Sequence, residues 1–126
     1  MVMDWPDVAL LAAGIIGAAV ALVHGAITQR LMVVPLRAVQ PRLAGPIRRI
    51  VPPLLHFSTF NWFLGGLALA AAALWAGPEA KLATGLLVGS SYLFGAAGNL
   101  WASRGRHPGW MLYTLALMLI AYGIAA

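Results

Sequence analysis

The sequence predicts an all-α membrane protein: one domain, residues 1–126, in which four transmembrane helices form a bundle and both termini lie outside the cytoplasm. Composition is the first observation, because 62% of the 126 residues are hydrophobic and only 9% are charged, against about 25% charged in ordinary soluble domains. A soluble fold of this size cannot bury so much apolar surface. The second observation is four apolar runs of membrane-crossing length, and the third is a charge bias between their connections.

The predicted spans cover residues 8–27, 54–76, 82–102 and 109–125. Each approaches the roughly 20 residues that a helix needs to cross about 30 Å of hydrocarbon. The first span carries no charge. Asp4 and Asp7 lie just before this span. They suit a first helical turn because carboxylates there meet free backbone N–H groups.

A basic connection, residues 30–50, joins the first two spans. Prolines within it are expected to break any helix, because proline lacks the backbone N–H and its ring clashes with the preceding turn; they are Pro35, Pro41 and Pro46. Pro52 and Pro53 are expected to open the second span, since proline is tolerated in a first turn. The connection is predicted to be a solvated loop or to lie in the plane of the lipid head groups.

Basic side chains fall on one side of this frame. Seven of the eight basic residues lie in or beside the first and third connections: Arg30, Arg37, Arg42, Arg48, Arg49, Arg104 and Arg106. The second connection has only Lys81, and all three acidic residues lie on its side. Cytoplasmic connections carry the excess of basic residues, so both termini are predicted to be periplasmic. The seven arginines are expected to contact anionic lipid head groups, and no nucleic acid is expected as a partner.

Several chemistries find no residues to carry them. The chain has no cysteine, which excludes disulfides and thiolate metal sites. No acidic residue or lysine lies within a predicted span, whereas proton-coupled transporters usually hold a carboxylate there. Neither a catalytic residue nor a metal site is assigned, and the protein is predicted not to be an enzyme.

Two histidines stand out within the predicted spans. His24 and His56 each lie about six residues from a loop arginine, which predicts a similar depth in the inner leaflet on neighbouring antiparallel helices. Ionisable residues in spans are rare and often functional. Two neutral imidazoles could ligate the iron of a haem or the metal of another tetrapyrrole, relay a proton or bind a quinone oxygen. The alternative is that each makes one hydrogen bond to another helix or to the backbone.

Four other polar residues are predicted to lie in the bundle interior: Ser58, Asn61, Ser91 and Asn99. They would either line a path for a small molecule or join helices through hydrogen bonds, and Asn61 and Asn99 could bond across helices. Small residues predict where helices approach closely in lipid, notably Gly14, Gly17 and Gly25 in the first span and a GxxxG pair in the third.

One pattern resembles a known group of proteins. It runs from His24 through Gln29-Arg30-Leu31 to Pro35-Leu36, and Leu55-His56 opens the next span. This half of the chain is similar to a group of small four-span bacterial membrane proteins of unassigned function. That group has an acidic residue where Gln29 stands and a tryptophan where Leu55 stands. The resemblance implies a bacterial inner-membrane protein and supplies no activity.

Three functions are predicted from these features. The first is a non-enzymatic accessory or assembly subunit that packs against a larger membrane complex or a second copy of itself. The second is a redox module that binds haem, another tetrapyrrole or a quinone through His24 and His56. The third is a small channel or carrier. A lipid-modifying enzyme is a further alternative, but such enzymes need acidic residues to hold a metal, and this chain has only three.

Overall fold

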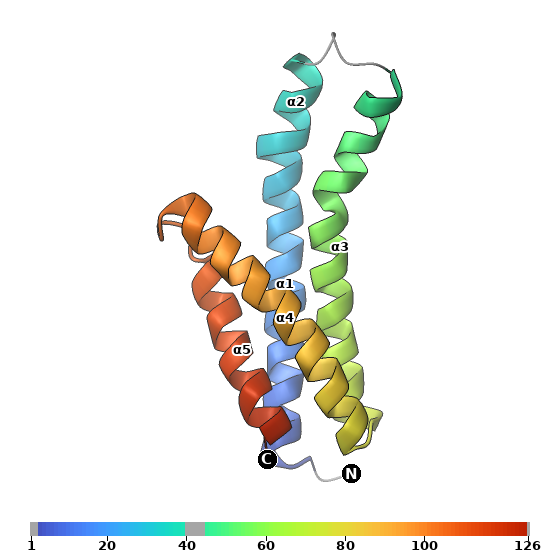
Figure 1. Ribbon diagram of the computed structural model, residues 1–126, viewed down its shortest axis with the longest axis vertical. Coiled ribbons are helices and arrows are strands. Elements are labelled where there is room, and N and C mark those ends of the chain that lie inside the picture. Colours follow the sequence, from blue (N-terminus) through green and yellow to red (C-terminus); the bar gives the residue numbers. More distant parts are fainter. Residues whose placement is uncertain (1–2, 40–44, 126) are drawn as a thin grey trace.

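The computed structural model describes residues 3–39 and 45–125, and in this part of the chain all regular structure is helical (Figure 1). The elements are α1 (Trp5–Thr28), a π-helical turn η1 (Gln29–Val33), α2 (Val34–Val39), α3 (Gly45–Trp75), α4 (Pro78–Ser103) and α5 (Gly109–Ala125). α1, η1 and α2 follow one another without a break and form one rod. The all-α prediction is confirmed, and the four predicted spans fall on α1, α3, α4 and α5.

Two rods are long and apolar enough to cross a membrane: residues Trp5–Ala38, of 34 residues, and Gly45–Trp75, of 31 residues. Only 33% and 28% of the residues in their most apolar stretches are buried within the chain, whereas a core helix of a soluble protein hides most of its apolar face. α5 is apolar but only 17 residues long, and α4 is less apolar. Two such helices favour a membrane location, while the number of spans and the side of the termini stay predictions.

The helices form a bundle around α1. α3 and α5 flank α1, and α4 crosses the bundle obliquely and packs against α3 and α5 (Figure 1). Both termini and the α3–α4 turn lie at one end (Figure 1). The α4–α5 turn lies only partway along the α1–α2 rod, so the far ends of that rod and of α3 extend beyond it (Figure 1). The core between these helices includes five large buried side chains: Leu10, Trp62, Leu69, Tyr92 and Tyr113.

Glycines set the spacing between α1 and α3. A Cβ atom added to Gly14 would lie 2.5 Å from the carbonyl oxygen of Gly66, and one added to Gly66 would lie 2.6 Å from the carbonyl oxygen of Gly14. A Cβ atom added to Gly25 would lie similarly close to the side chain of Thr59. The prediction that the small residues of the first span mark a close helix contact is therefore confirmed at Gly14 and Gly25.

A helix cap and an ion pair stabilise the end of the bundle at which the termini lie. The Asp7 N–H donates to Oδ1 of Asp4 at 2.9 Å, so Asp4 caps α1. The Asp7 carboxylate forms an ion pair with Lys81 in the first turn of α4. The expectation that these two acidic residues belong to the start of a helix is confirmed.

The expectation that Pro35 breaks the helix is wrong, because the rod continues through it to Val39. The π-helical turn just before Pro35 explains this. The N–H of Val34 bonds to the carbonyl of Gln29, five residues back. This wider turn makes room for the proline ring, so the helix continues although proline has no N–H to donate.

The prolines of α3 also differ from expectation. The helix begins at Gly45, so Pro46 lies in its first turn, and Pro52 and Pro53 lie inside the helix rather than at its start. The carbonyls that these inner prolines leave without a helical N–H partner belong to Arg48 and Arg49, two exposed residues. Most of the predicted basic connection is therefore helical. Pro41 and Arg42 lie outside the described residues.

Candidate functional site

His24 joins α1 to α3. Its Nε2 lies 3.2 Å from Oγ of Ser58 on α3 and 3.3 Å from Oγ1 of Thr28 on the next turn of α1. The imidazole also meets the indole of Trp62 edge to face, with ring centroids 4.8 Å apart. These contacts hold the ring at the boundary between the two helices, half-buried.

His56 joins α3 to η1. Its Nε2 lies 2.9 Å from Oε1 of Gln29, and because that oxygen only accepts, the imidazole donates. Each histidine thus makes a hydrogen bond to another helix, which is the alternative to cofactor binding that the sequence left open. The two histidines bond through Nε2 to different partners. A shared cofactor between His24 and His56 stays a prediction. In the described part of the chain, no group of three histidine, aspartate or glutamate residues is placed to hold a metal ion.

The four polar residues predicted for the interior occupy separate places. Ser58 lies against His24. Asn61 donates to Oγ of Ser91 at 2.8 Å and so links α3 to α4, although Asn61 itself is exposed. Asn99 donates to the carbonyl of Gly95 in its own helix at 2.9 Å. Among the described residues these four line no common cavity.

The arginines lie at the surface. Six of the seven predicted to contact lipid head groups are described, and all six are exposed: Arg30, Arg37, Arg48, Arg49, Arg104 and Arg106. Arg37, Arg48 and Arg49 come together with Pro52 and Pro53 around one groove at the far end of the α1–α2 and α3 rods.

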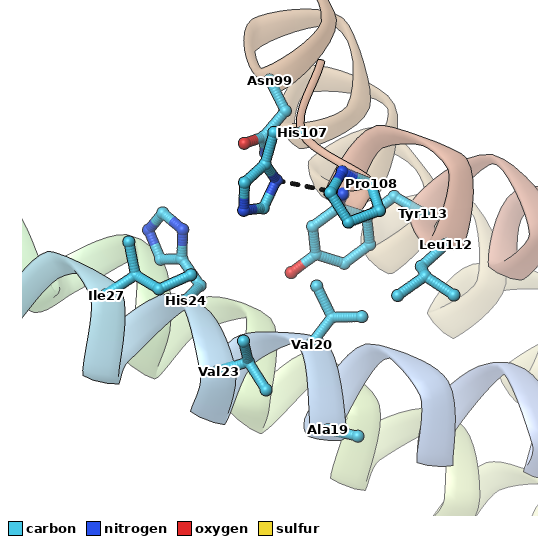
Figure 2. A pocket seen from close by; sticks show the side chains of 11 residues that line it. Ala19, Val20, Val23, His24, Ile27, Asn99, His107, Pro108, Leu112 and Tyr113 are labelled. Carbon is cyan, nitrogen blue, oxygen red and sulfur yellow. Dashed lines mark hydrogen bonds between the residues drawn. The ribbon is translucent and has the colours of Figure 1, made fainter. Parts of the chain in front are cut away.

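A pocket of ≈ 370 Å³ lies where α1 meets the α4–α5 turn (Figure 2). Its walls come from α1, the last turns of α4, the turn itself and the first turns of α5, and they are lined by Ala19, Val20, Val23, His24, Ile27, Asn99, His107, Pro108, Gly109, Leu112 and Tyr113. His24 and Asn99 were singled out in the sequence. His107 and Tyr113 were not, because His107 falls in a connection between predicted spans and Tyr113 reads as an ordinary aromatic residue of the fourth span.

The polar groups of this pocket point toward a common space (Figure 2). Nδ1 of His107 accepts the N–H of Gly109 at 3.1 Å, so in the neutral ring the proton is on Nε2. The Tyr113 side chain is fully buried, and its hydroxyl has no hydrogen-bond partner among the described residues. Figure 2 shows that hydroxyl directed toward α1, beside the space that separates His24 from His107.

Comparisons of the chain with family models, with curated proteins and with solved structures found no match. The arrangement itself offers hydrogen-bond donors inside an apolar pocket. The residues that line it include no carboxylate.

Proposed function

We propose that the protein is a multi-pass protein of the bacterial inner membrane, with four spans and periplasmic termini, and that it is a non-enzymatic accessory or assembly subunit of a larger membrane complex. The observation that carries the second part is a projection that we call the basic hairpin, residues 29–39 and 45–53. In the described part of the chain, neither α4 nor α5 reaches the tip of this hairpin (Figure 1).

Length supports the placing of the basic hairpin outside the hydrocarbon. A rod of 34 residues is about 51 Å long, whereas the hydrocarbon core is about 30 Å thick. If Trp5 and Trp75 lie at the periplasmic interface, about 20 residues of each rod cross the bilayer and end near His24 and His56. The remaining turns then extend into the head groups and the cytoplasm, where their arginines are favourable.

The hairpin also exposes apolar side chains that lipid would not cover in that position. Leu31 is 71% exposed, and four further large apolar residues are about half exposed: Met32, Val34, Ile47 and Ile50. Complete burial of each such side chain is worth about 1.5–3 kcal/mol. A mixed basic and apolar surface beside the membrane fits a partner subunit with acidic and apolar groups.

Site-specific photo-crosslinking in cells tests this proposal. A photoreactive amino acid at Leu31 is expected to capture one defined membrane protein, whereas the same amino acid at Leu87, 75% exposed on α4, is expected to capture lipid. Leu31→Ser should then release the captured protein during gentle purification. A chain that is always a free monomer, with lipid adducts at both positions, would overturn the accessory role.

The other two functions predicted from the sequence have less support. Both histidines already use Nε2 for a protein partner, so a cofactor between them would have to be held through Nδ1 of each ring. A conducting path requires a common lining, and Asn61 and Asn99 border different cavities.

A further inference from the structure

The pocket between α1 and the α4–α5 turn has the features of a binding site for a neutral molecule that accepts hydrogen bonds. We propose that it binds the head group of a lipid-soluble quinone, which is a ring with carbonyl oxygens on an apolar tail. His107 and Tyr113 donate to the carbonyls, and the apolar wall of α1 covers the ring. This site goes beyond the accessory role proposed above, and either proposal can fail without the other.

The size of the pocket suits one small ring system. Protein cavities that hold small molecules measure about 300–1,000 Å³, and the ≈ 370 Å³ here is near the lower end. The walls are apolar apart from a few polar groups, of which His24, His107 and Tyr113 border one space (Figure 2). Such a combination of apolar walls and few convergent polar groups is typical of ligand sites.

An unpaired donor is the feature that points to a missing partner. A buried hydroxyl without a hydrogen bond costs about 1–3 kcal/mol, and Tyr113 is fully buried with no partner among the described residues. Tyr92 shows the contrast, because its hydroxyl donates to the carbonyl of Trp62 at 3.3 Å. A carbonyl oxygen in the pocket would accept from Tyr113 and from Nε2 of His107.

Charge argues for a neutral ligand. The residues that line the pocket include no lysine, arginine, aspartate or glutamate. A carboxylate or phosphate would therefore lose its hydration without gaining an opposite charge, which is costly in an apolar site. A carbonyl oxygen needs only the donors that the pocket offers.

The pocket is reached from the side of the bundle. Val23 on α1 is 59% exposed and Leu112 on α5 is 43% exposed, although both line the pocket. In the proposed membrane orientation this side faces lipid. A molecule with an apolar tail can therefore enter from the bilayer and leave the tail outside.

Calorimetric titration of the purified protein in mild detergent with decyl-1,4-benzoquinone tests the site. We expect saturable binding at one site, and none of decylbenzene, which has the same ring size and tail without carbonyls. Tyr113→Phe should weaken quinone binding about fivefold to tenfold, the loss of one hydrogen bond. Tyr122→Phe, a change of the same kind at an exposed position of α5, should leave binding unchanged.

His107→Phe provides a second variant, because it removes the other donor and keeps a ring in the turn. It should also weaken binding while circular dichroism shows an unchanged helical content. The proposal is overturned if decylbenzene binds as well as the quinone, if folded Tyr113→Phe and His107→Phe bind it as the unaltered chain does, or if decanoate binds more tightly. Failure here leaves the crosslinking result at Leu31 untouched.

Discussion

Side chains of one small region illustrate how residue-level chemistry is arranged in this protein. Trp62 meets His24 at 4.8 Å on one side and Tyr113 at 5.0 Å on the other, and Tyr113 meets Tyr92 at 4.8 Å. This aromatic row crosses from α1 and α3 to α5 and α4. Ring contacts position Tyr113, whose buried hydroxyl has no hydrogen-bond partner among the described residues.

Phenylalanine substitutions should have opposite effects on stability at the two buried tyrosines. Without ligand, Tyr113→Phe should raise the free energy of unfolding by about 1 kcal/mol, because it removes an unpaired buried hydroxyl, whereas Tyr92→Phe should lower it by about 1 kcal/mol through a lost hydrogen bond. Unfolding in mixed detergent and sodium dodecyl sulfate, followed by circular dichroism, measures both. Equal effects of the two changes would contradict the difference in their partners.

The ion pair between Asp7 and Lys81 should couple α1 to α4. Both side chains are about four-fifths buried, with 18% and 20% of their surfaces exposed, so the pair should be worth more than a surface pair and less than a fully buried one, about 1–2 kcal/mol. A double-mutant cycle with Asp7→Asn and Lys81→Gln, measured by the same unfolding assay, gives this coupling. Strictly additive effects would show that the pair contributes nothing.

At the scale of elements, the approach of α1 to α3 depends on the absence of side chains. Carbonyl oxygens of Gly14 and Gly66 occupy the places that Cβ atoms would take. This close contact gains dispersion energy and lets the helices associate where lipid provides no hydrophobic drive. It also fixes the relative height of His24 and Ser58, which lie further along the same pair of helices.

Alanine substitutions at glycines should reveal which helix faces pack. Gly14→Ala should lower the free energy of unfolding by about 1–3 kcal/mol, because the added methyl group meets backbone that cannot move without parting the helices. Gly98→Ala is the matched control: nothing lies within 4 Å of its added Cβ, so it should be neutral or stabilise α4 by up to about 1 kcal/mol. A large loss of stability at Gly98 instead would indicate packing against another chain.

Proline placement is the other lesson at this scale. The rod passes through Pro35 because a π-helical turn precedes it, and α3 passes through Pro52 and Pro53 where the affected carbonyls belong to exposed arginines. A proline rule applied residue by residue predicts loops here, since it counts the lost hydrogen bond but not the local ways of replacing it.

For the molecule as a whole, charge is segregated along the long axis. The first turns of α1 and α4 carry Asp7, Glu79 and Lys81 and lie at one end, whereas the described arginines belong to the basic hairpin and to the α4–α5 turn, which lies partway along the α1–α2 rod (Figure 1). By the positive-inside rule, a membrane protein with this charge distribution would place its arginine-rich side in the cytoplasm.

Cysteine labelling tests the proposed sidedness directly, because the chain has no cysteine of its own. Gly77→Cys in the α3–α4 turn and Gly45→Cys at the start of α3 both add a side chain where nothing lies within 4 Å. In intact spheroplasts a membrane-impermeant maleimide should label Gly77→Cys, and it should label Gly45→Cys only after lysis. The reverse pattern, or equal labelling of both, would refute the orientation.

The sequence by itself determined the helical class and where the four main helices lie, except for the start of α3 and the continuation of the first rod through Pro35, because apolar runs and an acidic cap act locally. The cap at Asp4 and the apolar segments on α1, α3, α4 and α5 follow from such signals. It also singled out His24 and Asn99, since polar residues in apolar runs are conspicuous.

Only the tertiary structure decided what these residues meet. His107 lines the same pocket as His24, although the two are far apart in the sequence, because α4 crosses the bundle obliquely. The periodicity of the sequence does not predict that crossing. Tyr92 donates its hydroxyl to the carbonyl of Trp62, whereas the neighbouring Tyr113 hydroxyl has no partner among the described residues. The length of the basic hairpin likewise depends on the continuation of two helices through their prolines. Pockets and unpaired groups arise from packing between distant segments, and for that reason local sequence patterns do not contain them.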